Sequence, residues 1–268
     1  PTSHLILHEE DSYRELWGLD GQLLGDPDRV LTCDDLQQAD PGVMGAIVLE
    51  LPMREIGGQL PSWSDLKAQV NWARQHDIAI HFDGARLWHC PAYYRKALSE
   101  ISALADSVYV SLYKDIGGIA GAVLAGETDF IEEARIWNRR AGGNLYSFYP
   151  FILSAERGLD DNLASIEEAV PYARTLGSLF ARIPGVQVNP DPPQAAMFHL
   201  HIQFGEDELA QIIDDYRRDH DVIVLPAPRG NDQQGNSVCE ISVGRSTMKH
   251  PPEFWREHLV AALASRSP

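Results

Sequence analysis

The chain has 268 residues and a formal net charge of −17, from 22 basic and 39 acidic residues. Such an acidic chain is not expected to bind nucleic acid or anionic membranes, whose phosphates demand basic surface. Its 44% hydrophobic and 23% charged residues are typical of a globular protein that can bury one large domain and a smaller one.

Cysteine usage and apolar run lengths predict a cytoplasmic protein. The three cysteines are far apart and form no Cys-x-x-Cys pair, which favours reduced thiols. No stretch approaches the ~18 consecutive apolar residues of a membrane span. The amino terminus has no signal-peptide pattern and no initiating Met, as expected of a fragment or a processed product.

In chain order, the first part alternates short apolar runs with helical patterns. Thr32 is a possible helix N-cap, and Ser62 or Ser64 can cap a helix that runs to about residue 76. Buried strands are predicted at 45–51, 78–82, 107–112 and 120–125, and further helices at about 91–105, 128–140, 147–162 and 164–183. This alternation predicts a mostly parallel sheet with helices on both faces.

The pattern changes after the Pro-Gly pair at 184–185. Strands are predicted at 186–188, 197–204 and 238–243, with helices near 206–220 and 252–264. We therefore predict an α/β large domain at 1–163 and a small α+β domain at 164–268.

Charged residues follow two of the predicted strands. Asp83 and Arg86 come after the run 78–82, and Lys114 and Asp115 come after the run 107–112. In an open α/β sheet, ligands collect outside the carboxyl ends of the strands. An acid and a lysine at one edge suit pyridoxal phosphate, because the lysine forms a Schiff base with its aldehyde and the acid pairs with its pyridine nitrogen.

Alternatives exist for each of these residues. His81 and Asp83 lie on one strand face and are both possible metal ligands, but no third or fourth ligand stands at a recognisable spacing, so no metal site is predicted. Taken alone, Lys114 could be an ordinary solvated loop lysine. Its place after an apolar strand, with glycines at 117 and 118 that allow a ligand to approach the backbone closely, favours a functional role. Arg86, at a helix start, makes sense if it meets an anion such as a substrate carboxylate.

Three strings together carry a family resemblance. HFDGARLW, DSVYVSLYKDIGGIAGAVLAG and FIEEARIWNRRAGG, at these separations, resemble the low-specificity threonine aldolases. These belong with the aromatic amino acid β-eliminating lyases among pyridoxal-phosphate enzymes of fold type I. The resemblance covers almost the whole chain and is strongest over residues 45–143.

The resemblance implies a role for each matching residue. Lys114 resembles the lysine that binds the cofactor, Asp83 the partner of the pyridine nitrogen, and Arg86 a ligand of the substrate carboxylate. His4 resembles the histidine that stacks on the cofactor ring and takes part in proton transfer. Arg245, after the run CEISVG, is a weaker match to a carboxylate-binding arginine. A homodimer or homotetramer with active sites at the interface is also implied.

The chain departs from the family pattern at three places. It begins three residues before His4, so the phosphate-binding loop and the amino-terminal part of the large domain are expected to be missing from it. PMREIGG at 52–58 replaces a Thr-His-Asn sequence, with Arg54 or Glu55 as possible substitutes for the histidine. Tyr146 stands where an arginine reaches the phosphate, and Arg139 and Arg140 are other basic residues within that region.

These features predict a carbon–carbon lyase that cleaves a β-hydroxy-α-amino acid, threonine or a bulkier one, to glycine and an aldehyde. Two alternatives remain at this point. One is another pyridoxal-phosphate lyase or transferase, such as a β-eliminating enzyme. The other is a catalytically inactive protein of the same fold that acts as a binding partner.

Overall fold

A computed structural model describes residues 1–264 and divides them into two compact units. The first unit holds residues 1–53 and 60–167, and the second holds residues 54–59 and the described residues from 168 onward. The second unit thus includes a short excursion of the chain, residues 54–59, from within the first. That the domain boundary itself falls between 163 and 164 stays a prediction.

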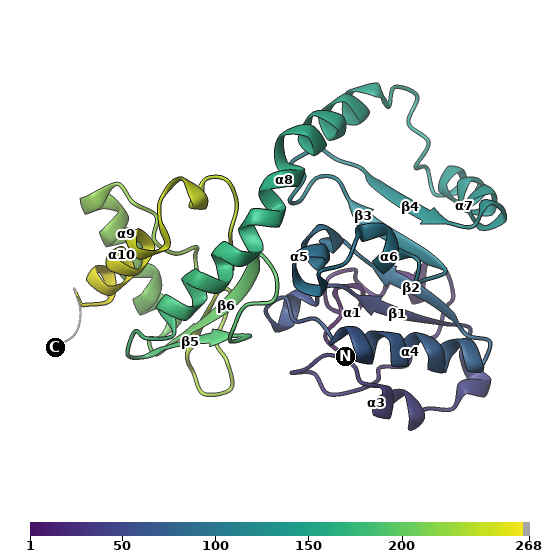
Figure 1. Cartoon of the computed structure of the whole chain (residues 1–268), viewed down its shortest axis with the longest axis horizontal. Coiled ribbons are helices and arrows are strands. Elements are labelled where there is room, and N and C mark those ends of the chain that lie inside the picture. Colours follow the sequence, from purple (N-terminus) through teal and green to yellow (C-terminus); the bar gives the residue numbers. More distant parts are fainter. Residues whose placement is uncertain (265–268) are drawn as a thin grey trace. The chain divides into compact units, whose positions relative to one another are not determined.

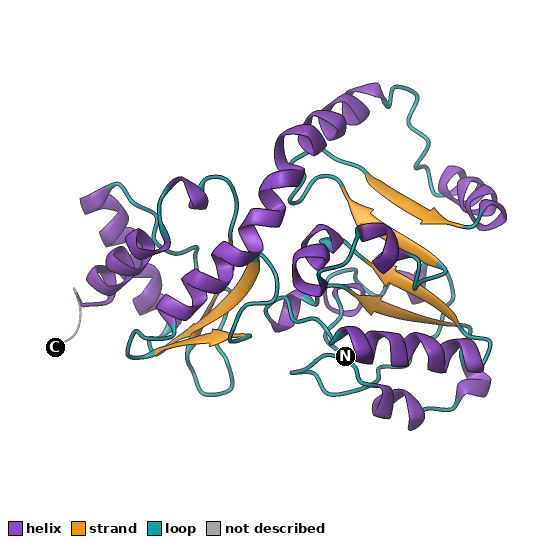
Figure 2. Ribbon diagram, in the orientation of Figure 1, coloured by secondary structure: helices purple, strands orange, loops and turns teal. Residues whose placement is uncertain are grey.

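The sheet of the first unit has four strands in the order β1-β2-β3-β4 (Figure 2). Their bounds are β1 (Ala46–Glu50), β2 (Ala79–Asp83), β3 (Ser107–Ser111) and β4 (Ala122–Gly126). β1, β2 and β3 run parallel, and β4 pairs antiparallel with β3. The sheet is therefore mostly parallel, as predicted. Side chains of the parallel strands, such as Ile80 and Phe82, are fully buried.

The prediction that residues 120–125 form a buried strand was right in conformation and wrong in burial. Every residue of β4 is exposed. The opposite edge strand, β1, contributes Ile47 and Leu49 to the core, whereas only β3 and α7 make extensive contact with β4, so the faces of β4 are left uncovered. Apolar composition alone does not distinguish an edge strand from a central one.

The helices of the first unit are α1 (His4–Leu7), α2 (Ser12–Glu15), α3 (Cys33–Gln37), α4 (Trp63–Gln75), α5 (Cys90–Tyr94), α6 (Leu98–Ser102), α7 (Thr128–Arg140) and the first part of α8 (Tyr149–Phe180). Three of them, α4, α7 and α8, are long, and the others have four or five residues. Helix α4 contacts β2, and α3 packs against α4 (Figure 1). The predicted caps are confirmed: Thr32 caps α3 in a reciprocal capping box with Asp35, and Ser62 caps α4.

Two helix predictions were wrong in their continuity. The helix expected at 91–105 is split into α5 and α6, because Arg95 takes a left-handed backbone conformation (φ 55°) that ends α5. The helices expected at 147–162 and 164–183 are instead the single helix α8. Pro171 lies within α8 and does not end it.

The second unit has a three-stranded antiparallel sheet. Its order is β5-β6-β7, with β5 (Val186–Asn189), β6 (Met197–Ile202) and β7 (Ser237–Ser242). The helices α9 (Glu206–His220), α10 (Pro252–Ala264) and the last part of α8 complete it. The predicted strands and helices of this region are confirmed to within two residues at each end.

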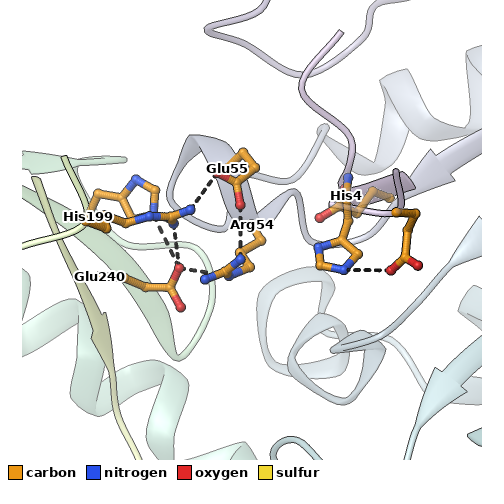
Figure 3. A network of polar contacts seen from close by, with 8 residues as sticks. His4, Arg54, Glu55, His199 and Glu240 are labelled. Carbon is orange, nitrogen blue, oxygen red and sulfur yellow. Dashed lines mark hydrogen bonds and ion pairs between the residues drawn. The ribbon is translucent and has the colours of Figure 1, made fainter. Parts of the chain in front are cut away.

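A ring of alternating charges fastens the excursion 54–59 to this sheet (Figure 3). Arg54 lies 3.1 Å from Glu55 and 2.9 Å from Glu240. Arg229 closes the ring with contacts of 2.6 Å to Glu55 and 2.7 Å to Glu240. The Arg229 guanidinium also lies 3.2 Å from Nε2 of the buried His199. Because each charge has two opposite neighbours, the ring neutralises itself in a partly buried place.

Two glycines let the excursion lie flat against that sheet. Gly57 and Gly58 both have positive φ, near +78° and +75°. A Cβ on Gly57 would collide with the carbonyl oxygen of Asn189, and one on Gly58 would lie 2.9 Å from that of Met197. Only glycine allows this backbone conformation and this close approach together.

We expect Gly84→Ala to destabilise the first unit by about 1–3 kcal/mol, the usual cost of overpacking. A Cβ on Gly84 would lie 2.7 Å from the carbonyl oxygen of Tyr109 and 2.9 Å from Cβ of Leu87. Gly45→Ala is the matched control, since a Cβ there meets no atom within 4 Å. Urea unfolding followed by circular dichroism measures both, and equal unfolding midpoints for the two variants would contradict the packing described for Gly84.

Candidate active site

The carboxyl ends of the three parallel strands place polar side chains side by side. Glu50 pairs in register with Asp83, and Asp83 pairs in register with Tyr109. Lys114 follows β3 by three residues. The predicted acid and lysine are therefore delivered to one edge by neighbouring strands, the place where ligands bind in open α/β sheets.

Hydrogen bonds between the two loops that leave β2 and β3 hold this edge together. The Gly84 N–H donates to the carbonyl oxygen of Tyr109 at 2.9 Å. The Ser111 hydroxyl donates to the carbonyl oxygen of Ala85 at 2.6 Å, and the Trp88 indole N–H donates to that of Ser111 at 3.2 Å. The segment with Asp83 and the segment with Lys114 are thus bound to each other directly.

His4 is held at both its backbone and its ring by carboxylates. Its backbone N–H donates to Oε2 of Glu50 at 2.8 Å. Its ring Nε2 lies 3.2 Å from Oε1 of Glu9, a contact drawn as a dashed line beside His4 in Figure 3. Glu50 is buried, so one fixed group joins the end of β1 to the backbone of His4.

Burial and the charged groups around His4 shift the pKa of its ring. Burial lowers the pKa of His4, and the positive charges of Lys114 and His8 lower it further. Glu9 and Asp83 raise it, but the net pKa is below 6.5. His4 is therefore neutral at pH 7. Since Lys114 and Asp83 both influence its ring, the structure brings these three predicted residues to one place.

Lys114 and Asp83 are both half-buried. The Lys114 ammonium lies 5.7 Å from the centre of the Tyr113 ring and makes no ion pair within residues 1–264. Oδ1 of Asp83 accepts a long hydrogen bond of 3.4 Å from the Ala85 N–H. Burial raises the pKa of the neighbouring Tyr109, as do its contact with Tyr113 and the charge of Asp83. That phenol is therefore protonated at neutral pH.

Arg86 and Arg245 belong to different units of the chain. Arg86 faces Asp115, with Nε 3.8 Å from Oδ2. Arg245 belongs to the second unit, in the exposed segment after β7. For both, binding of a substrate carboxylate stays a prediction.

His81 is used as a structural residue in this fold. Its Nδ1 lies 2.8 Å from the Ser107 hydroxyl on the next strand. Burial lowers the pKa of His81, against a smaller opposite effect of Asp83. Among residues 1–264, no three His, Cys, Asp or Glu side chains are grouped closely enough to hold a metal ion.

The sequence patterns missed three residues of this edge. Glu50, His89 and Asp115 received no role, and only Glu50 has a local sequence signal. Glu50 is an acid at the end of the apolar run GAIVLEL, where a charge needs a partner. His89 is buried, and its Nε2 lies 3.3 Å from Oδ1 of Asp115. A single histidine after Leu-Trp belongs to no sequence motif, so only the fold reveals that His89 pairs with Asp115.

None of the helices within residues 1–264 is long and apolar enough to cross a membrane.

We expect the His4 pKa, measured by NMR titration, to lie below 6.5 and to rise in Lys114→Met, which removes a positive charge beside it. Lys67→Met, at an exposed position of α4, is the control and should change nothing. Because the folded chain resists protonation of His4, its contribution to stability is complete above pH 6.5 and is lost as the pH falls from there toward the lower folded-state pKa. An unchanged His4 pKa in Lys114→Met would contradict the proximity of the two groups.

Comparison with known proteins gives a consistent result. A family profile described as "Beta-eliminating lyase" matches residues 1–203. A protein of Arabidopsis thaliana named probable low-specificity L-threonine aldolase 2 is 27% identical over 184 residues, which is 67% of this chain and 51% of that protein. The low-specificity L-threonine aldolase of Escherichia coli K12 is 24% identical, over 72% of this chain and 55% of its own. The chain thus spans about half the length of these curated relatives.

Solved structures resemble almost the whole of this chain. A Listeria monocytogenes protein, a candidate L-allo-threonine aldolase, has a TM-score of 0.92 and 38% identity, over 98% of this chain and 73% of its own. A protein of Exiguobacterium sp. 255-15, a candidate aromatic amino acid β-eliminating lyase or threonine aldolase, has a TM-score of 0.89 and 35% identity, over 97% and 73%. They confirm the predicted fold class, that of the pyridoxal-phosphate enzymes of fold type I, with pyridoxal phosphate as the family's cofactor. The chain belongs to the beta-eliminating lyase family.

Proposed function

We propose that this chain carries the lysine-bearing part of a pyridoxal-phosphate site that cleaves the Cα–Cβ bond of a β-hydroxy-α-amino acid. The products are glycine and an aldehyde. The observation that carries the proposal is the convergence of His4, Asp83 and Lys114 at the carboxyl edge of the parallel strands. Relatives and structural neighbours named as threonine aldolases support the reaction type.

The side chains at this edge fit the cofactor chemically. Lys114 is a half-buried amine without an ion-pair partner within residues 1–264, so it is accessible for linkage to an aldehyde. Asp83 has acceptor capacity beyond its long contact with Ala85, as a partner of the pyridine nitrogen needs. His4 presents a neutral ring that can lie against a flat aromatic cofactor. When bound, pyridoxal phosphate supplies an electron sink for the carbanion at Cα.

The protein's own residues then divide the remaining work. The Asp83 carboxylate would pair with the pyridine nitrogen of the bound cofactor and favour its protonated form. Glu9 faces Nε2 of His4, which fixes the ring proton there and leaves Nδ1 as the basic atom. We assign to Nδ1 the role of the base that removes the proton of the β-hydroxyl, either directly or through water. Cleavage moves the Cα–Cβ electron pair to Cα, converts the hydroxyl-bearing carbon to an aldehyde, and ends when Cα takes up a proton.

The proposal also concerns the size of the substrate's side chain. The segment 52–58 contains no histidine, and Arg54 and Glu55 are both engaged by the charge ring of the second unit. We propose that the substrate is a β-hydroxy-α-amino acid bulkier than threonine. Small amino acids are the substrate class of related pyridoxal-phosphate enzymes.

A second candidate reaction is β-elimination from an amino acid, favoured by the description of the matching family. It uses the same lysine and aspartate, so the two reactions differ only in their products. Cα–Cβ cleavage gives glycine and an aldehyde, whereas β-elimination followed by hydrolysis gives ammonia and a keto acid.

We expect the purified protein with added pyridoxal phosphate to show a visible absorbance band that is lost in Lys114→Ala. The control is Lys67→Ala, which removes an exposed lysine of α4 and should keep the band. With a panel of amino acids, glycine and aldehyde should accumulate and ammonia should not. Ammonia and keto acid instead would establish β-elimination. Absence of the band in the unsubstituted protein would favour the inactive binding protein over either enzyme.

We also propose that the protein assembles as a homodimer or homotetramer. Apolar side chains of β4 and α7 are well exposed, including Phe130 and Trp137 at 45% each. An exposed apolar patch of this kind usually marks an interaction surface. Because the family resemblance implies a symmetric homo-oligomer, we propose that a second copy of the chain covers this patch.

Sedimentation equilibrium should show a dimer or tetramer, and Ile136→Glu, on the exposed part of α7, should raise its dissociation constant at least tenfold by placing a charge in an apolar contact. Val43→Glu is the control, because Val43 is exposed in the first unit but lies outside β4 and α7. A monomer at high protein concentration would rule the assembly out.

A further inference from the structure

Glu50 is a buried acid at the carboxyl end of β1, beside the acid of the proposed site. Its residue is 8% exposed. Its Cα pairs in register with that of Asp83 on β2. The backbone is fixed just beyond it, because the Leu51 N–H donates to the carbonyl oxygen of Asp83 at 2.9 Å. The sheet therefore holds the backbone of Glu50 in a fixed place relative to Asp83.

The side chain of Glu50 reaches a segment 46 positions away in the sequence. Its Oε2 accepts the backbone N–H of His4 at 2.8 Å. His4 is the first residue of α1, a helix of four residues that has no buried side chain. So short a helix gains little stability from its own hydrogen bonds, and its place depends on contacts with the rest of the unit. A carboxylate that accepts a backbone N–H makes one of the stronger contacts of this kind.

A second contact attaches the same segment to a different part of the first unit. The Thr2 hydroxyl donates to the carbonyl oxygen of Pro27 at 2.9 Å, and this hydrogen bond is exposed. Pro27 lies in the loop before α3, outside the strands of the sheet. The contact at Thr2 therefore does not bind His4 to the sheet edge, whereas the contact at Glu50 does.

The pKa of the His4 ring reports on where the ring lies. Burial lowers this pKa, and the charges of Lys114 and His8 lower it further. The charges of Glu9 and Asp83 raise it. His8 and Glu9 belong to the same short segment as His4, whereas Lys114 and Asp83 belong to the sheet edge. A ring displaced from the edge would lose its burial and the charge of Lys114, so its pKa would rise toward 6.5.

We propose that Glu50 is a positioning residue that holds the His4 ring at the carboxyl edge of the sheet, beside Asp83 and Lys114. This inference rests on the proposed function, in which His4 is the base. Glu50 acts through the backbone of His4 and contacts neither cofactor nor substrate. Two acids then divide the work, since Glu9 faces the ring and sets its tautomer, and Glu50 fixes where the ring lies.

The first test is an NMR titration of His4 without cofactor, with the resonance assigned by its loss in His4→Gln. Glu50→Ala removes the acceptor, and Glu50→Asp keeps a carboxylate but shortens its reach by one methylene. We expect the His4 pKa to rise toward 6.5 in both variants. The shift that Lys114→Met causes in the His4 pKa should fall to less than half in either background. Glu50→Gln keeps a carbonyl oxygen for the N–H and should keep the pKa below 6.5.

The direction of the shift distinguishes positioning from a direct effect of charge. A carboxylate favours the charged form of a nearby imidazole, so loss of the Glu50 charge alone would lower the His4 pKa. A lower pKa in Glu50→Ala, or an unchanged one in Glu50→Asp, overturns the proposal. The control is Thr2→Val, which removes the hydrogen bond to Pro27 and should leave the His4 pKa unchanged.

A further measurement needs no substitution and serves if the Glu50 variants do not fold. In the unsubstituted protein, the His4 amide should exchange its hydrogen at least tenfold more slowly than in the unfolded chain, because its N–H is bonded to Glu50. Exchange at the rate of the unfolded chain overturns the proposal.

The last readout is the pH profile of the loaded enzyme. In Glu50→Ala and Glu50→Asp, kcat for glycine formation should fall at least tenfold, and the acid limb of the profile should move to higher pH together with the His4 pKa. A general loss of structure would lower kcat without moving that limb. Glu50→Gln should recover most of the activity. An acid limb that stays in place despite a raised His4 pKa overturns the link to catalysis.

Failure of the proposed function is distinguishable from failure of this inference. If the unsubstituted protein shows no visible band with pyridoxal phosphate, the proposed function falls. The titration and the amide exchange of His4 use no cofactor, so they still decide whether Glu50 holds the His4 ring at the edge.

Discussion

The parallel pairing of β1, β2 and β3 is the constraint on which the site depends. Because the strands run in one direction, their carboxyl ends meet at one edge, and register sets Glu50, Asp83 and Tyr109 beside one another. The side chains of these strands that face inward are apolar and buried, so a shift of register would move charged groups into the core. The chemistry of the edge is thus fixed by the same packing that stabilises the sheet.

Loop contacts convert this edge into a site of defined geometry. The Gly84 N–H, the Ser111 hydroxyl and the Trp88 indole each join the loop after β2 to the segment around β3. Only glycine fits at position 84, where a side chain would meet the Tyr109 carbonyl. The string DGAR therefore combines a candidate cofactor-binding residue, Asp83, with a glycine, Gly84, that allows close backbone contact with Tyr109.

The sequence was sufficient for the fold class and for placing Asp83 and Lys114 at this edge. Strand runs, caps such as Thr32, and the DGAR and lysine strings are local patterns, so one chain reveals them. Exposure of β4 was missed because burial depends on which other elements cover the faces of a strand, and apolar content does not reveal that cover. The split of the helix at Arg95 was missed because an arginine in the left-handed conformation gives no local signal.

The site itself was predicted only where local motifs report on it. Lys114, Asp83 and His4 were found from strings, whereas Glu50, His89 and Asp115 act through partners distant in sequence. The charge ring of Arg54, Glu55, Arg229 and Glu240 is hidden for the same reason, since it joins residues 174 positions apart. Long-range pairing of single charged residues leaves no period and no motif to read.

The central claim is that Lys114 is the residue to which pyridoxal phosphate becomes attached, and borohydride reduction tests it most directly. The chain has only four lysines, at positions 67, 96, 114 and 249, so peptide mapping by mass spectrometry assigns the reduced cofactor to one of them without ambiguity. The account predicts a single stoichiometric label on the peptide that contains Lys114. A label on another lysine, or no label at saturating cofactor, would contradict it.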